Sequence, residues 1–192
     1  LAEPALEGET QVAVRVAGVC NTDLEVLRGY RPMSGVLGHE FVGVAVSPGP
    51  LQGKRVVGEI NIRPNGCTCP ACARGDLTQC AQRTVLGIKG RNGSFAERLS
   101  LPTENLHVVP DSVADHEAVF VEPLAAACEV LEQVAVRATD RVVVVGPGKL
   151  GLLVAQVLAT IGCAPIVVGR RQSALDMARG LGLAVNGLAD AP

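Results

Sequence analysis

The chain has 192 residues, 48% of them hydrophobic, which suffices for one or two domains with a real core. The formal net charge of -2 and the absence of a Lys/Arg-rich run argue against a nucleic acid or an anionic membrane as the main partner. Because Gly and Pro break the longest apolar runs well before membrane-spanning length, we expect no membrane segment and a small molecule as the partner.

The first half of the chain carries short strand-like segments. Val-rich runs at Gln11–Val16, Phe41–Val46 and Arg55–Ile60 are separated by Gly, Pro and Asn, and the pattern continues to Val109. We therefore predict a small barrel-like or partly open sheet in this half.

Residues around Cys20 and His39 have the chemistry of an open metal site. A catalytic zinc needs three protein ligands and one exchangeable position, and the ligands come from distant parts of the chain. His39 lies in a glycine-flanked, acid-paired setting, GVLGHEFVG, with Glu40 as a fourth ligand or a supporting carboxylate. Near Cys20, Thr22 could pass a proton from a bound alcohol and Asp23 could fix the tautomer of His39. Taken singly, each would more often be an ordinary core or surface residue.

Four of the seven cysteines, Cys67, Cys69, Cys72 and Cys80, fall within fourteen residues. Four thiolates bind Zn²⁺ tetrahedrally at about 2.3 Å and leave no position for substrate, so this cluster predicts a structural zinc. Because the number of cysteines is odd and the clustering is local, we expect reduced thiols and a cytoplasmic protein rather than a disulfide framework.

From Glu122 onward the stretch EPLAAACEVLEQVAV has the composition of a helix, with Pro123 tolerated in its first turn. This change predicts two domains, residues 1–124 and residues 125–192. Cys128 on this helix and Cys163 further along are expected to be core thiols.

The second domain contains a G-x-G-x-x-G motif in the context that a dinucleotide site requires. Val142–Val145 precede it as a buried parallel strand should, and Lys149–Ile161 follow with helical spacing. The glycines allow the tight turn, the approach of a pyrophosphate and close helix packing, while the helix N-terminus offers N–H groups. The alternative is that the glycines only shape the turn. The predicted cofactor-binding residues here are Gly146, Gly148, Lys149, Leu150 and Gly151.

The next strand ends in Gly169, Arg170 and Arg171, with no carboxylate to bind a ribose 2′-hydroxyl. Two guanidiniums could hold a 2′-phosphate there, and Gly169 would leave room for it, so we predict NADP over NAD. The alternative is a solvated pair of arginines at a helix start.

Five motifs follow one another along the chain: GVCNTDLEVLRGY, GVLGHEFVG, the cysteine loop, VEPLAAA and VVVVGPGKLG. In this combination the chain resembles the zinc-dependent medium-chain alcohol and polyol dehydrogenases over essentially its whole length. The resemblance implies an α/β protein with a GroES-like, β-rich, zinc-binding catalytic domain followed by the first half of a Rossmann NAD(P)-binding domain. It also implies that the sequence is a fragment, incomplete at its N-terminus and truncated after two βα units, of a protein that forms homo-oligomers.

By the same resemblance Cys20, His39 and Glu122 are the catalytic zinc ligands, with Glu40 adjacent to the metal. A Glu at the third position resembles the sorbitol, threonine and glucose dehydrogenase branches. The chain departs from the family at Gly66, which occupies the expected first cysteine position of the structural loop. Cys67 could still bind the metal through a local shift of the loop, and the alternatives are a three-thiolate site or a metal-free lobe. The chain also carries Glu25 where many members have a relay His.

The implied activity is hydride transfer between an alcohol or ketone, with a polyol or another secondary alcohol favoured, and NAD(P). Zinc would act as the Lewis acid. The alternatives are a non-catalytic metal-stapled nucleotide-binding module and a zinc-free quinone reductase on the same fold. About two zinc ions per chain would favour the dehydrogenase, one the module and none the reductase.

Overall fold

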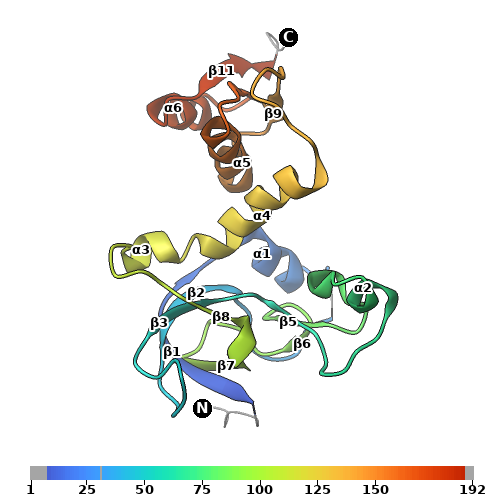
Figure 1. Cartoon of the computed structure of the whole chain (residues 1–192). Helices are drawn as coiled ribbons and strands as arrows, with labels where there is room; N and C mark the ends of the chain where they lie inside the picture. Colours follow the sequence, from blue (N-terminus) through green and yellow to red (C-terminus); the bar gives the residue numbers. More distant parts are fainter. Residues whose placement is uncertain (1–7, 31, 189–192) are drawn as a thin grey trace. The chain divides into compact units, whose positions relative to one another are not determined.

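The computed structural model describes residues 8–30 and 32–188. The chain forms two compact units, Leu1–Glu122 with two sheets and Pro123–Pro192 with one (Figure 1). Among the described residues no helix combines the length and the apolar character needed to cross a membrane.

The first unit is built on a five-stranded antiparallel sheet in the order β7-β1-β2-β3-β8. Its strands are β1 (Glu9–Gly18), β2 (Glu40–Ala45), β3 (Arg55–Gly58), β7 (Arg98–Pro102) and β8 (Leu106–Val108). Val12, Phe41, Val56 and Leu101 are at most 2% exposed and pack together in the core of this unit. The predicted strands in this half are therefore confirmed.

A smaller sheet, β4-β5-β6, completes a half-barrel next to a long loop. Its strands are β4 (Asn61–Ile62), β5 (Thr84–Leu86) and β6 (Gly90–Arg91). Between β4 and β5 the chain leaves the sheet and forms two short helical turns, α2 (Pro70–Ala73) and η1 (Leu77–Gln79). The remaining short helices of this unit are α1 (Asn21–Leu27), η2 (Thr103–Asn105) and α3 (Asp115–Ala118).

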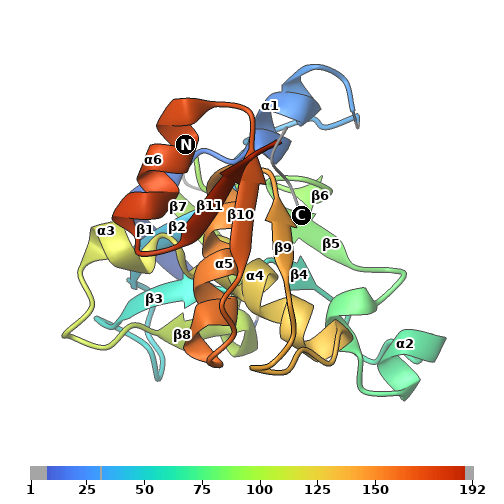
Figure 2. The same cartoon turned by 90° about the horizontal axis from the view of Figure 1, so that it is seen from above.

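The second unit is a three-stranded parallel sheet in the order β11-β10-β9 with helices between its strands (Figure 2). Its elements are β9 (Val143–Val145), α5 (Lys149–Thr160), β10 (Ile166–Gly169), α6 (Gln172–Gly180) and β11 (Ala184–Gly187). α5 packs on β9 and β10, and α6 packs on β10 and β11. The predicted order of strand, glycine turn, helix, strand and helix is confirmed.

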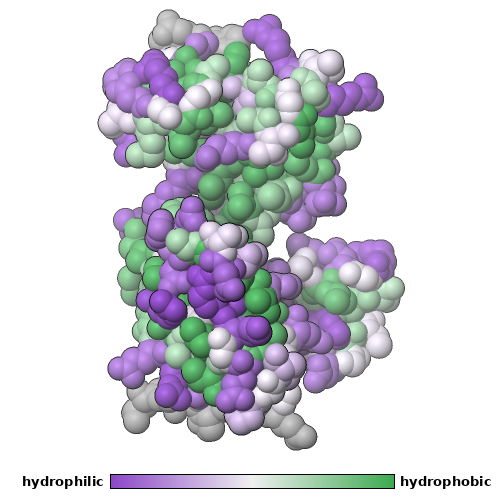
Figure 3. Space-filling view, turned by 60° about the vertical axis from the view of Figure 1, so that its left-hand side comes forward, coloured by the Kyte–Doolittle hydropathy of each residue, from purple (hydrophilic) through white to green (hydrophobic). Residues whose placement is uncertain are grey.

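The prediction that the valines before the glycine motif form a buried strand is only half right. Val144 packs against the core that includes Leu152 and Ala155 of α5. Val143 and Val145 point to the opposite face, because strand side chains alternate, and they are 40% and 74% exposed. Figure 3 shows apolar side chains on the surface of this unit. The run is apolar, but its side chains on the second face of β9 are exposed in the part of the chain that the structure describes.

Helix α4 (Val121–Gln133) forms where helical composition predicted it, with Pro123 in its first turn. Only Ala127 of this helix is buried. The neighbouring Cys128 is rotated about 100° away from Ala127 and is exposed, so the prediction that it is a core thiol is wrong. Cys163 is buried and donates to the carbonyl oxygen of Asp140 at 3.6 Å, as a core thiol should.

Candidate metal centre and nucleotide site

Asp23 joins the two segments that carry the predicted open metal site. Its Oδ2 accepts from the backbone N–H of Cys20 at 2.8 Å and so caps the start of α1. Its Oδ1 accepts from the backbone N–H of Gly38 at 3.2 Å. Asp23 is 2% exposed, so both bonds are protected from water. This one carboxylate therefore holds Cys20 next to the Gly38–His39 turn.

The glycine before His39 is required by close packing. Gly38 has φ +95°, and a Cβ on it would lie 2.6 Å from both Ser94 Oγ and the Phe95 ring. Any side chain here would push the turn away from the segment that carries Ser94 and Phe95, and so would displace His39, the next residue. The glycine-flanked histidine thus has a structural cause that the sequence alone did not give.

Cys20, His39 and Glu40 offer ligand atoms that all lie within 4.8 Å of one another. The Cys20 thiol also lies 3.6 Å from the Thr22 hydroxyl. His39 is 3% exposed, and its Nδ1 is 3.3 Å from Asp23 Oδ1. That contact lacks hydrogen-bond alignment, so Nδ1 is buried without a bonded partner. A thiol, an imidazole and a carboxylate with ligand atoms this close together, the imidazole on a buried histidine, fit a zinc ion.

Glu122 does not belong to this group of three, but the charges of Glu40 and Asp23 affect the pKa of its carboxyl group. Burial raises its pKa to about 7, and repulsion from Glu40, Glu59 and Asp23 adds to the shift. A divalent ion bound near these carboxylates would offset their mutual repulsion. Glu122 therefore also fits the metal, as a ligand that ionises when the metal binds.

Sequence reasoning did not select Glu59, whose negative charge helps to raise the pKa of Glu122. Its Oε1 accepts from the backbone N–H of Asn61 at 2.7 Å and from Asn61 Nδ2 at 2.8 Å. The available signal was a lone glutamate directly after a Val-rich strand, with Asn two residues later. The spacing between Glu59 and Asn61 matches no recognisable motif.

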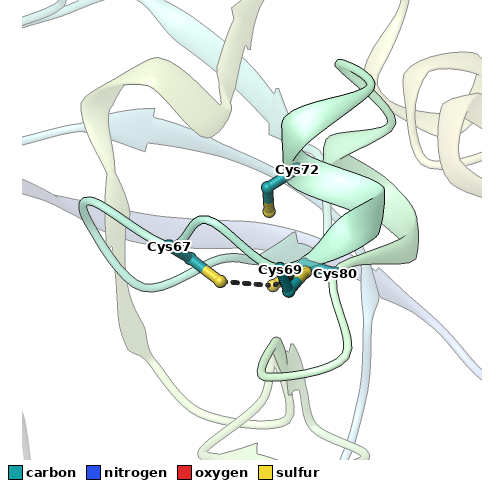
Figure 4. Close-up of side chains that lie close together, drawn as sticks. All are labelled: Cys67, Cys69, Cys72 and Cys80. Carbon is teal, nitrogen blue, oxygen red and sulfur yellow. Dashed lines mark hydrogen bonds between the residues drawn. The ribbon is translucent and has the colours of Figure 1, made fainter.

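The four clustered cysteines converge around α2 (Figure 4). The Cys80 sulfur lies 3.5 Å from that of Cys67 and 3.9 Å from that of Cys69, and all four sulfurs are within 4.8 Å of one another. Gly66, just before Cys67, has φ +69°, a turn conformation in which glycine is unstrained. Cys67 thus reaches the cluster despite its irregular spacing, and the set fits a tetrahedral zinc.

The thiols of this cluster differ in acidity. Backbone N–H groups of Cys72 and Ala81 donate to the Cys69 sulfur and lower its pKa to about 6. Desolvation raises the pKa of Cys72 to about 12, and hydrogen bonds with the thiols of Cys80, Cys69 and Cys67 contribute. Metal binding must therefore expel at least the Cys72 proton.

The glycine turn after β9 borders a pocket of about 570 Å³. Gly146 has φ +104°, and a Cβ on Gly148 would meet nothing within 4 Å. A Cβ on Gly151 would collide with the carbonyl oxygen of Gly146. These three positions do what a pyrophosphate-binding turn requires. The pocket lining is Val145, Gly146, Pro147, Gly148, Val168, Gly169, Arg170, Arg171 and Leu188; Lys149 and Leu150 are exposed at the start of α5.

Gly169 lines this pocket, but its missing side chain serves a neighbour. A Cβ on Gly169 would lie 2.5 Å from the Pro147 ring, so the glycine accommodates Pro147 rather than leaving open room. Arg170 and Arg171 are exposed, and within the described residues neither forms an ion pair.

Residues 6–111 match the family model of the alcohol dehydrogenase GroES-like domain. The chain belongs to the zinc-type medium-chain alcohol dehydrogenase family. Within this family it is 35% identical over 168 residues to a sorbitol dehydrogenase of Halalkalibacterium halodurans, covering 84% of this chain and 48% of the relative. It is 33% identical over 168 residues to an L-threonine 3-dehydrogenase of a Chelativorans species, covering 82% and 48%. The chain thus spans about half the length of these curated relatives.

Solved structures of dehydrogenases share the fold. A short chain alcohol dehydrogenase of Escherichia coli CFT073 in complex with NADH superposes with a TM-score of 0.90 at 31% identity, covering 99% of this chain and 58% of that chain. A zinc-binding dehydrogenase of Sinorhizobium meliloti 1021 bound to NADP superposes with a TM-score of 0.89 at 29% identity, covering 99% and 57%. Similar proteins therefore include both NADH and NADP complexes.

Proposed function

We propose that this chain supplies the zinc site and the nucleotide turn of a dehydrogenase that transfers hydride between a polyol or another secondary alcohol and NADP. The observation that carries the proposal is the meeting of Cys20, His39 and Glu40 within 4.8 Å, separate from a second cluster of four cysteines. A protein that needed metal only for folding would have no use for the first group. The whole protein is further expected to form homo-oligomers.

Cys20, His39 and Glu122 would hold the catalytic zinc, with Glu40 beside it, and the cysteine cluster would hold the structural zinc. When bound, the catalytic zinc supplies Lewis acidity that lowers the pKa of an alcohol, and the nicotinamide accepts the hydride. Buried Asp23 keeps His39 and Cys20 in place through its contacts with both segments. Thr22, whose hydroxyl lies 3.6 Å from the Cys20 sulfur, would carry the substrate proton outward.

For the cofactor, Gly146 and Gly148 would admit the pyrophosphate, with backbone N–H groups at Lys149 and Leu150 and close packing at Gly151. Gly169 shapes the pocket at the end of β10, where Arg170 and Arg171 form no ion pair with any residue that the structure describes. Two guanidiniums beside the pocket favour a 2′-phosphate over a 2′-hydroxyl, and hence NADP.

The test uses the protein that carries this chain and a panel of polyols and secondary alcohols. Oxidation of each alcohol is monitored through the accompanying reduction of NADP. Cys20→Ser and His39→Ala should abolish the zinc-dependent turnover and leave NADPH binding within about twofold of wild type, since the nucleotide turn lies in the other unit. Full activity in either variant would refute the assignment. A non-catalytic module would bind NADPH and show no turnover with any alcohol.

A further inference from the structure

The glycine turn after β9 lies against the C-terminal end of β10 (Figure 2). Val145 pairs with Val168 in the parallel register, and the Gly146 N–H donates to the Val168 carbonyl oxygen at 2.8 Å. Pro147 follows directly and has no N–H group, so the strand pairing cannot continue past Gly146. Its ring instead lies against Gly169, the last residue of β10, and both residues line the pocket of the nucleotide turn.

Gly169 is a glycine for reasons of space. Its φ lies outside the left-handed region that favours glycine, so its backbone would accept any residue. A Cβ on Gly169 would have as its nearest neighbours the Cγ and Cδ atoms of Pro147, both at 2.5 Å, and Cδ2 of Leu175 at 3.4 Å. Only the two proline contacts are prohibitive, since carbon atoms pack at about 3.5–4.0 Å. A proline ring is closed on its own backbone and cannot rotate away, so Pro147 excludes a side chain at position 169.

The position that Pro147 closes is the one where a carboxylate would favour NAD. In dinucleotide-binding units an Asp or Glu about 20 residues after the glycine motif hydrogen-bonds the ribose 2′-hydroxyl. Gly169 stands at the end of the strand that follows the motif, and the exposed Arg170 and Arg171 come next. Glycine at this position thus removes the group that favours NAD and leaves two guanidiniums beside the pocket.

We propose that Pro147 is a specificity-determining residue for the nicotinamide cofactor, because its ring confines position 169 to glycine. The ring acts by exclusion: it denies the pocket a carboxylate, and Arg170 and Arg171 then favour the 2′-phosphate. The cofactor preference therefore cannot be reversed at position 169 alone, whereas removal of the Pro147 Cγ and Cδ atoms makes the reversal possible. The proposal rests on the nucleotide site of the proposed function.

A cycle of alanine variants in the protein that carries this chain tests the collision without any cofactor. Gly169→Ala should lower the melting temperature by about 2 °C or more, because the new Cβ has to displace the Pro147 ring. Pro147→Ala removes the two colliding atoms, so Gly169→Ala added to it should cause no further loss. Gly180→Ala is the matched control, because a Cβ on Gly180 in the same unit meets nothing within 4 Å, and it should not lower the melting temperature.

Fluorescence titration of the same protein with NADH and NADPH tests the effect on specificity. Gly169→Asp alone should displace the turn and weaken the binding of both cofactors by about tenfold or more. Pro147→Ala/Gly169→Asp should bind NADH about tenfold more tightly than Gly169→Asp does, because the carboxylate can then reach the ribose 2′-hydroxyl. It should bind NADPH poorly, because the carboxylate repels the 2′-phosphate. Pro147→Ala alone should keep the wild-type preference, since it introduces no carboxylate.

Two results would each overturn the proposal and leave the proposed function standing. One is a melting temperature of Gly169→Ala equal to that of wild type, and the other is an NADH affinity of Gly169→Asp equal to that of the double variant. If Gly169→Asp folds only together with Pro147→Ala, the collision is confirmed directly, and if neither aspartate variant folds, the alanine cycle decides. A wild-type protein that binds neither NADH nor NADPH would overturn both the proposed nucleotide site and this role of Pro147.

Discussion

Asp23 Oδ1 lies 3.3 Å from Nδ1 of the buried His39 while the other oxygen of Asp23 caps the helix that starts after Cys20. One carboxylate thus contacts the segments that carry both Cys20 and His39, the proposed sulfur and imidazole ligands. Asp23→Asn should retain the cap in part but replace the charge facing His39. We expect zinc affinity at the open site to fall by about 10- to 100-fold, measured by competition with a chromophoric chelator. Affinity equal to wild type would show that Asp23 has no influence on the metal.

Glu122 provides a pH test with a defined sign. Its pKa in the folded metal-free chain is raised to about 7, mainly by burial and further by repulsion from Glu40, Glu59 and Asp23. The stability it contributes is therefore complete below its unfolded pKa of about 4.3 and lost as pH rises through about 7. In the presence of a chelator, Glu122→Gln should raise the free energy of unfolding by about 2 kcal/mol near pH 8 and change it little near pH 4.5.

Bound zinc should reverse the sign of the effect of Glu122→Gln on the free energy of unfolding. With zinc present Glu122→Gln should lower stability near pH 8, because a ligand is lost. Urea unfolding at both pH values, with and without zinc, measures both effects. Glu104→Gln, at a side chain that is 62% exposed, is the control and should be neutral in all four conditions. A variant that stabilises the chain equally with and without zinc would rule out Glu122 as a ligand.

The cysteine cluster should take up zinc more tightly as pH rises. The pKa of Cys72 is about 12, so this thiol is protonated near pH 7 and must lose its proton to bind. Affinity should rise by at least about tenfold per pH unit between about pH 6 and 8, measured by chelator competition corrected for chelator protonation. A pH-independent affinity would mean that Cys72 does not ligate.

Cys67 is the cluster member with the irregular spacing, yet its sulfur is 3.5 Å from that of Cys80. Cys67→Ser should weaken zinc binding by the cluster by about 100-fold or more. The exposed Cys128 offers a matched control, and Cys128→Ser should have no effect. If Cys67→Ser binds zinc as wild type does, the cluster is a three-thiolate site.

Substitutions at two glycines of the nucleotide turn should affect different properties, NADPH binding at Gly148 and stability at Gly151. Gly148 has φ -86° and open space around its Cβ direction, so Gly148→Val should lower NADPH affinity by about tenfold or more with an unchanged melting temperature. Gly151→Ala would collide with the Gly146 carbonyl oxygen and should cost about 1–3 kcal/mol of stability. Fluorescence titration with NADPH and thermal unfolding separate the two. Equal effects of both variants on stability would contradict the described turn.

Arg170→Gln and Arg171→Gln should each weaken NADPH binding by about tenfold and leave NADH binding nearly unchanged. Arg179→Gln in α6, the helix that begins after Arg171, is the control, because Arg179 pairs with Asp176 at 2.6 Å, and it should affect neither cofactor. Tighter binding of NADH than of NADPH by the wild-type chain would overturn the predicted preference.

Local patterns predicted the elements of both units, because each strand, turn and helix depends on residues within one short segment. The meeting of Cys20 with His39 was anticipated from residue chemistry, whereas the turn at Gly38 that permits it depends on Ser94 and Phe95 from distant sequence. The burial of β9 was mispredicted because a strand's hydrophobicity does not say whether both its faces are covered. Glu59 was missed because its influence on Glu122, which is 63 residues away in the sequence, depends on the fold and has no motif spacing.

The zinc content of the purified chain tests the central claim most directly. We expect about two zinc ions per wild-type chain, one at Cys20 and His39 and one in the cysteine cluster, and about one in Cys20→Ser. Elemental analysis after dialysis against metal-free buffer gives this number. A single zinc in wild type, or two zinc ions retained in Cys20→Ser, would contradict the open catalytic metal site.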